Sequence, residues 1–169
     1  MEKERLHFTI ERFDHYYDSV NNKSNIVLGF GTIIFGSLIT VYPALSDKVE
    51  FTWLMHSLLI LTCGLGFVAM MILIFASIPH LKSNGKSVHF FHSISKMGKI
   101  DFFNKSEKLS EEDELKDLRT QVFHLSNGLT SKFKQLRIAI YCIVFQMILL
   151  IPYIILILTH IKTTSNGNL

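Results

Sequence analysis

The sequence predicts an all-α membrane protein with three transmembrane helices and a small, mostly helical cytosolic module. Residues 24–46, 51–81 and 138–161 contain no Asp, Glu, Lys or Arg, and each stretch exceeds the roughly 20 apolar residues that a helix needs to span a bilayer. Charged residues make up 18% of the chain, below the about 25% usual in soluble domains. A helical pattern also runs from residue 110 without a proline until Pro152, so we expect a long helix continuous with the third span. These features exclude a soluble enzyme as the default, a disordered chain and a disulfide scaffold.

Residues 1–24 are predicted to form a cytosolic amphipathic helix. Apolar side chains recur there at the spacing of one helix face, namely Leu6, Ile10, Phe13, Tyr17 and Val20. The polar face is not dominated by Lys and Arg, as it would be in a helix that lies on lipid. The helix is therefore expected to cover another cytosolic segment.

Residues 25–78 are predicted to form a transmembrane helical hairpin. Its first span covers about residues 25–42 and ends at Pro43, and its second span covers about residues 53–78. The connection between them is short, which favours a tight turn. The third span is predicted at residues 138–160, and a polar, disordered tail is expected at 161–169.

Residues 79–137 are predicted to form the cytosolic module. Ser110 and Asp113 have the spacing of a capping box at the start of the long helix, whereas the pattern of residues 88–94 fits a short helix or a strand. So small a module cannot bury a large core. We therefore expect it to pack on residues 1–23, on the membrane surface or on copies of itself.

The distribution of basic residues predicts the orientation in the membrane. Four Lys or Arg residues precede the first span and eleven lie between Lys82 and Arg137, but only Lys48 lies in the hairpin connection and only Lys162 follows the third span. Basic residues are enriched on the cytoplasmic side of a membrane. The N-terminus and the module are therefore expected in the cytoplasm, and the C-terminus outside.

Small and polar residues in the spans predict close helix packing and a homo-oligomer. Small residues every fourth position let helices approach, and an amide inside a membrane is costly unless it is paired. We therefore expect Gln146 to hydrogen-bond another helix, in the same chain or in a neighbour. The predicted packing residues are Thr32, Gly36, Thr40, Thr62, Gly66 and Gln146.

The sequence carries no catalytic signature, and we expect neither an enzyme, a cofactor nor a metal site. There is no phosphate-binding glycine loop and no nucleophile elbow. His89 and His92 lack further ligands at a defined spacing. Both are therefore expected to be ordinary polar histidines.

Two short patterns nevertheless fit a ligand. Asn22 and Lys23 lie at the entrance of the first span, where they form either part of a ligand site or plain interfacial residues. Phe90 and Phe91 are followed by basic residues at Lys96 and Lys99. Aromatic faces stack on bases and Lys attracts phosphate, although buried aromatics of a small subdomain would give the same pattern.

Three stretches of this chain, residues 16–24, 88–94 and 117–137, resemble the Pycsar effector family. These are membrane effectors of bacterial pyrimidine-cyclase antiphage systems, related to the membrane effectors of CBASS systems. The resemblance covers nearly the whole chain in the expected order. It implies a multi-pass protein of the bacterial inner membrane.

The resemblance implies that the protein senses a cyclic nucleotide on the cytosolic side. A partner cyclase would make the ligand, cyclic CMP or cyclic UMP, and its binding would make the spans assemble or rearrange until the membrane loses integrity and the infected cell stops growing or dies. Nucleic acid is not an expected partner. The alternatives are a membrane scaffold without a ligand and a constitutive membrane toxin.

The residue types and the resemblance together predict a ligand site. Phe90 or Phe91 would stack on the base, while polar and basic side chains would bind the phosphate and the base edges. Lys108 is taken as a surface position outside this site. The predicted ligand-binding residues are Asn22, Lys23, Phe90, Phe91, Lys96, Lys99 and Gln121.

Overall fold

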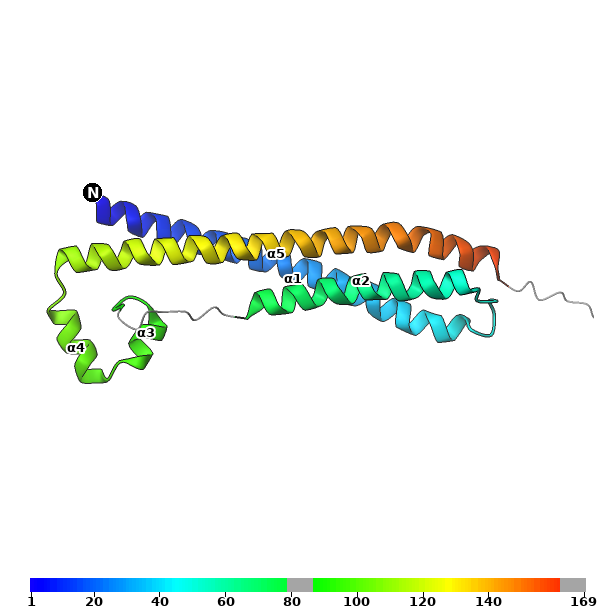
Figure 1. The fold of residues 1–169 in the computed structure, drawn as a ribbon, viewed down its shortest axis with the longest axis horizontal. Helices are drawn as coiled ribbons and strands as arrows, with labels where there is room; N and C mark the ends of the chain where they lie inside the picture. The colour runs from blue at the N-terminus through cyan, green and yellow to red at the C-terminus, as the bar shows by residue number, and fades with distance from the viewer. Residues whose placement is uncertain (79–86, 162–169) are drawn as a thin grey trace, which may run out of the picture. The chain divides into compact units, whose positions relative to one another are not determined.

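The computed structural model describes residues 1–78 and 87–161 (Figure 1). Residues 162–169 of the tail predicted at 161–169, and residues 79–86, lie outside the described residues. In the described part the elements are α1 (Glu2–Leu45), α2 (Trp53–Ser77), α3 (Phe91–Lys96), α4 (Lys99–Glu107) and α5 (Glu111–Thr159). The helices α1, α2 and α5 are long and apolar enough to cross a membrane. The predicted all-α class, with three such helices and a long final one, is confirmed.

The first helix, α1, contains both the predicted amphipathic helix and the predicted first span. It runs without interruption through residues 1–24 and 25–42, and Pro43 lies inside it. The predicted end at Pro43 is therefore wrong. Pro43 removes one backbone hydrogen bond, but the helix ends at Leu45, so few residues depend on the turn that Pro43 weakens. The Ser46 hydroxyl also donates to the Pro43 carbonyl at 2.7 Å, which satisfies a terminal acceptor.

The capping box predicted at the start of the long helix is present. Ser110 caps α5, since the Asp113 amide donates to Ser110 Oγ at 3.1 Å and that hydroxyl donates to the Asp113 carboxylate at 2.7 Å. Residues 91–96 form a short helix, not a strand. The helix α4 was not predicted from the sequence, because its nine residues carry too little apolar periodicity.

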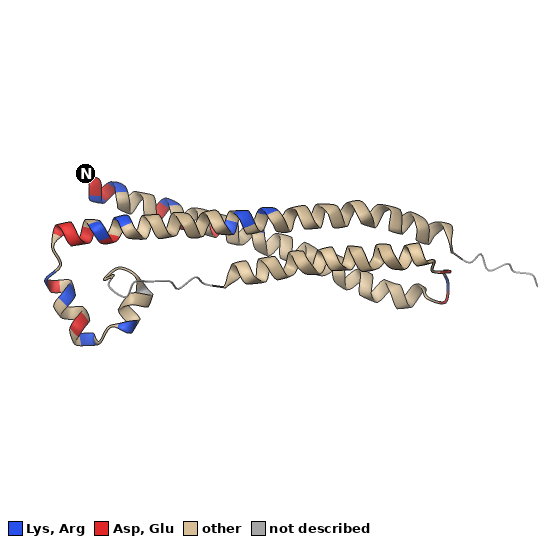
Figure 2. Ribbon diagram, in the orientation of Figure 1, with Lys and Arg blue, Asp and Glu red and all other residues tan. Residues whose placement is uncertain are grey.

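The chain divides into two compact units, and α1 and α5 each contribute to both. The polar unit consists of Met1–Asn21 and Ile78–Phe133, and the apolar unit consists of Asn22–Ser77 and Lys134–Leu169. In Figure 2 most of the charged residues lie on the helices of the polar unit, while α2 carries none. Each unit is described by itself below.

In the apolar unit the three long helices approach one another at Gly31, which has no side chain to separate them. A Cβ built on Gly31 of α1 would lie 3.3 Å from Ile143 of α5 and 3.4 Å from Met70 of α2. Large apolar side chains such as Trp53 and Ile33 remain exposed on this unit, as expected where lipid covers them. The protein is a multi-pass membrane protein.

In the polar unit the start of α1 packs on α5. Lys3 Nζ lies 2.7 Å from Glu114 Oε2, and Arg119 donates to both carboxylate oxygens of Glu2 at 2.8–2.9 Å. The lysine hydrogen bond, followed by the charges of Lys3 and nearby histidines, holds the pKa of Glu114 below its ordinary value. The amphipathic helix thus covers α5 of the same chain.

Further along α1, Tyr17 forms a second contact between α1 and α5. Tyr17 donates from its hydroxyl to the Leu125 carbonyl at 3.0 Å, and a Cβ built on Gly128 would overlap that hydroxyl. Lys132 donates to Asn21 Oδ1 at 2.8 Å and lies over the Tyr17 ring. Partial burial lowers the pKa of Lys132 and raises that of Tyr17, where the nearby charge of Asp14 adds to the shift.

Candidate ligand-binding site in the polar unit

The polar unit contains a cavity of about 840 Å³ between the segment before α3, α4 and the first half of α5. Small-molecule sites typically measure about 300–1,000 Å³, so a mononucleotide fits by size. The α5 residues Asp113, Asp117, Gln121 and His124 line it from one helix face. The cavity is lined by Ser87, Val88, Phe90, Ser93, Asp101, Asn104, Lys105, Lys108, Leu109, Asp113, Lys116, Asp117, Thr120, Gln121, His124 and Leu125.

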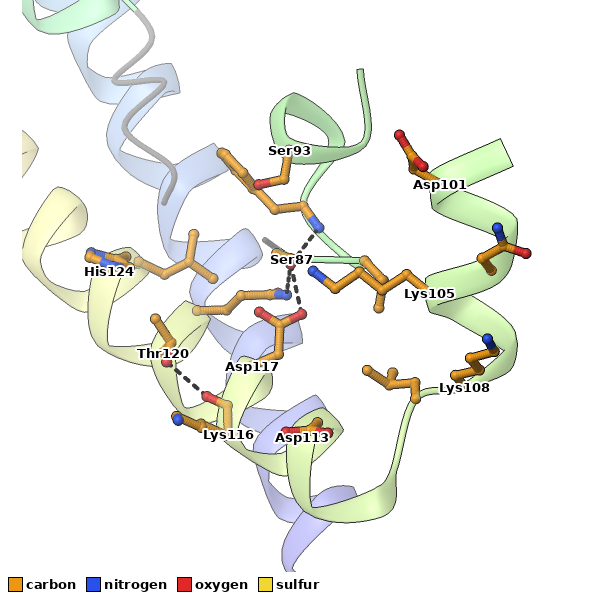
Figure 3. A pocket seen from close by; sticks show the side chains of 16 residues that line it. Ser87, Ser93, Asp101, Lys105, Lys108, Asp113, Lys116, Asp117, Thr120 and His124 are labelled. Atoms are coloured by element: carbon orange, nitrogen blue, oxygen red, sulfur yellow. Dashed lines mark hydrogen bonds between the residues drawn. The ribbon is translucent and has the colours of Figure 1, made fainter. Parts of the chain in front are cut away.

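Ser87 fastens one wall of the cavity to α5 (Figure 3). Its hydroxyl donates to Asp117 Oδ2 at 2.7 Å and accepts from Gln121 Nε2 at 3.2 Å. The same oxygen accepts from the backbone amides of His89 and Phe90 at 3.1 and 3.0 Å. This network fixes the chain just before α3, and with it the position of Phe90.

The charged side chains around the cavity carry both signs. Figure 3 shows Lys105 extending from α4 toward Ser87 and Asp117. Lys108 and Lys116 also line the cavity, as do three aspartates, of which Asp113 accepts the Ser110 hydroxyl. Such a balanced lining suits a ligand with a small net charge and several hydrogen-bonding groups better than a polyanion.

Two of the predicted ligand residues line this cavity. Phe90 and Gln121 are both among its walls, whereas Lys96 and Lys99 are exposed and do not line it. Lys99 Nζ instead lies over the Phe103 ring, 5.8 Å from its centre. The side chain of Phe91 lies outside the described part of the structure.

The lysines that line the cavity differ from those predicted from the sequence to bind a ligand. Lys108, taken from the sequence as a surface position outside the site, is one of its walls, and so is Lys105. Asn22 and Lys23 are exposed residues of α1 in the apolar unit and do not line it. The structure thus offers lysines for a phosphate that differ from those chosen by sequence.

A signal for the missed residues does exist in the sequence. Asp113, Asp117, Gln121 and His124 recur at spacings of 4, 4 and 3, which places them on one face of a helix. Leu118, on the same helix, is buried. A polar face on a helix that is partly buried indicates a polar segment or a ligand opposite that face. Ser87 and Lys105 carry no such signal, because only the fold brings them to that face.

The packing residues predicted in the spans fall into two groups. Thr32, Gly36 and Thr40 are exposed, and nothing lies within 4 Å of a Cβ built on Gly36. In contrast, Thr62 and Gly66 of α2 are buried. The first group therefore forms an open ridge on α1, and the second group lies inside the unit.

Gln146 of α5 is packed against Gly66 of α2. Its side chain is 0% exposed, and a Cβ built on Gly66 would overlap its amide. Neither amide atom has a hydrogen-bond partner among the described residues. The Thr62 hydroxyl, on the same helix as Gly66, donates to the Leu58 carbonyl at 2.7 Å. The hydrogen bond expected for Gln146 is absent from this part of the chain.

The comparisons with known proteins place the chain in a family. Residues 5–159 match the Pycsar effector protein domain. Comparison with curated proteins and with solved structures gave no match. The matched range includes the cavity, α2, α5 and α1 from Arg5 onward.

Proposed function

Because the chain belongs to the Pycsar effector family, and is thereby a membrane effector of antiphage defence, we propose that it senses a cyclic nucleotide in the cavity of the polar unit. Binding of cyclic CMP or cyclic UMP, made by a partner cyclase, then leads to loss of inner-membrane integrity and to growth arrest or death of the infected cell. The protein itself catalyses no reaction. Its N-terminus and polar unit lie in the cytoplasm.

The observation that carries the proposal is that one helix contributes both to the cavity and to the membrane. Gln121 lines the cavity, and the same α5 continues to Thr159 through the third apolar stretch. A ligand shifts a conformational equilibrium only if it binds one arrangement better than the other. A nucleotide held between α4 and α5 meets that condition when α5 moves relative to α4.

The walls supply groups suited to each part of a cyclic nucleotide. The Phe90 ring lines the cavity and suits the base, because aromatic side chains stack on any base. Lys105 points into the cavity from α4 and suits the single negative charge of a cyclic phosphate. Gln121 and Asp117 suit the polar edges of the base.

The direct test is calorimetry on the purified full chain against cyclic CMP, cyclic UMP, cyclic purine mononucleotides and cyclic oligonucleotides. We expect a cyclic pyrimidine mononucleotide to bind most tightly. Lys105→Ala and Phe90→Ala should each weaken binding by about tenfold or more, since a charge-assisted bond contributes about 1.5–3 kcal/mol and a stacked base about 1–3 kcal/mol. Lys99→Ala, on the same short helix but outside the cavity, serves as the matched control.

The outcomes separate this proposal from its alternatives. If Lys99→Ala loses binding and Lys105→Ala keeps it, the site is the one expected from sequence and not the cavity. If no cyclic nucleotide binds, the sensing proposal fails. If the wild-type protein depolarises cells that lack any cyclase, at equal expression, the protein is a constitutive toxin.

A further inference from the structure

Gln146 is an anomaly in the apolar unit. It lies within the third span, its side chain is 0% exposed, and both amide atoms lack partners in the part of the chain that the structure describes. A buried amide without hydrogen bonds is unfavourable, and more so in a medium without water. The helix packing around it therefore holds an unsatisfied group that hydration would relieve.

The contact that buries this amide depends on a glycine. Gly66 has no room for a Cβ, because the Gln146 side chain occupies that volume. Thr62, one turn earlier on α2, is also 0% exposed and donates its hydroxyl to the Leu58 carbonyl, and it is not a hydrogen-bond partner of either amide atom. We call the contact of Gly66 with Gln146 the α2–α5 seam.

We propose that the α2–α5 seam is where the apolar unit opens, and that the open state hydrates Gln146 as part of an aqueous path. Separation of the two helices at this point removes the unfavourable burial of the amide, whereas separation at a purely apolar contact would only expose apolar surface to water. Polar residues inside a membrane often mark such paths. The trigger of the opening rests on the proposed function, since α5 also lines the cavity.

The first test changes the glycine without changing the nucleotide site. Purified full-length Gly66→Ala in phosphatidylethanolamine–phosphatidylglycerol vesicles should release potassium about tenfold faster than wild type without any nucleotide, because the added Cβ forces the seam apart. Gly64→Ala is the matched control, since nothing lies within 4 Å of a Cβ there. The double variant Gly66→Ala/Gln146→Ala should return to the wild-type rate, because the shorter side chain vacates the overlapping volume.

The second test removes the amide. Gln146→Met keeps a long side chain but has no group that needs hydration. It should raise the melting temperature of the detergent-solubilised protein by about 2–4 °C and raise the nucleotide concentration needed for leakage about tenfold. Nucleotide binding measured by calorimetry should be unchanged.

The results separate this inference from the proposed function. The melting temperature and the nucleotide-free leak need no ligand, so they stand even if no cyclic nucleotide binds. If Gly66→Ala leaks no more than Gly64→Ala, the seam is not the opening. If Gln146→Met lowers the melting temperature and weakens an oligomer, the amide is paired with a neighbouring copy and the inference is overturned.

Discussion

Gly128 of α5 shows how a single missing side chain shapes the polar unit. It leaves room for the hydroxyl end of Tyr17, which donates to the Leu125 carbonyl at 3.0 Å. Glycine is otherwise unfavourable inside a helix by about 1 kcal/mol. We infer that the contact between α1 and α5 compensates for this cost.

We therefore predict that Gly128→Ala destabilises the protein. Overpacking costs about 1–3 kcal/mol, and the gain in helix propensity of about 1 kcal/mol offsets only part of it. The free energy of unfolding, measured by denaturation in detergent, should fall by about 1 kcal/mol. Tyr17→Phe removes the overlapping oxygen, so the double variant should be more stable than Gly128→Ala alone, and equal losses in both would contradict the steric explanation.

Glu114 gives a prediction about pH at the same scale. Its pKa is held below the ordinary 4.5 by the hydrogen bond from Lys3 and then by nearby positive charges. A carboxyl group with a lowered pKa stabilises the folded state above its unfolded pKa, and that contribution is lost as the pH falls through the folded value. Glu114→Gln should therefore have a lower melting temperature than wild type at pH 7, and the difference should shrink below about pH 4.5. A difference that stays constant down to pH 3 would show that the charge is not its source.

At the scale of the element, α5 is the helix that would transmit a signal. It begins beside the cavity at Glu111 and ends at Thr159, and Pro152 is its only internal proline. The proline lies beyond Gln146, so no proline interrupts the helix between the cavity and the α2–α5 seam. A continuous helix transmits a rotation or a shift with little loss.

We predict that two glycines inserted after Phe133 uncouple binding from membrane damage. Glycine breaks helical continuity and the insertion changes the rotational register of everything that follows, while the cavity residues all precede it. Calorimetry should give unchanged nucleotide affinity, and the membrane-potential dye should report no depolarisation in cells that carry the cyclase. The same insertion after Ile161 is the control, and depolarisation by both variants would exclude coupling through α5.

At the scale of the whole molecule, the distribution of charge predicts the orientation. The basic residues concentrate before the first span and between the second and third spans, which favours a cytoplasmic N-terminus and polar unit. Alkaline phosphatase fused at Asp47 should be active, and a fluorescent protein fused at Ser106 should be bright. Fluorescence from a fluorescent protein fused at Asp47 would show the opposite orientation and contradict the prediction.

The open ridge on α1 leads to a prediction about assembly. Thr32, Gly36 and Thr40 are exposed, and Gly36 contacts no other part of the described chain within 4 Å of a built Cβ. A ridge of small residues suits close packing between copies in the membrane. Gly36→Leu should shift the detergent-solubilised protein toward smaller species in multi-angle light scattering, with Ile33→Leu as the control; an unchanged mass would place any interface elsewhere.

The sequence alone determined the membrane class, the three long helices and the capped start of α5. These follow from local properties, namely the length of uncharged stretches, the helical repeat of apolar residues and the spacing of Ser110 and Asp113. Phe90 and Gln121, two of the residues predicted from the sequence to bind a ligand, line the same cavity, and their role in binding stays a prediction. The sequence places the end of α1 at Pro43, but the helix continues to Leu45. A proline so close to the end of a helix does not stop it.

Only the tertiary structure decided which residues meet. Ser87 and Lys105 join the α5 face through contacts between segments distant in sequence, and no local pattern encodes such contacts. Lys96 and Lys99 satisfy the composition of a phosphate site yet do not line the cavity. The overlap of Gly66 with Gln146 likewise depends on the register of two helices, which packing of the whole apolar unit sets and the sequence of neither helix reveals.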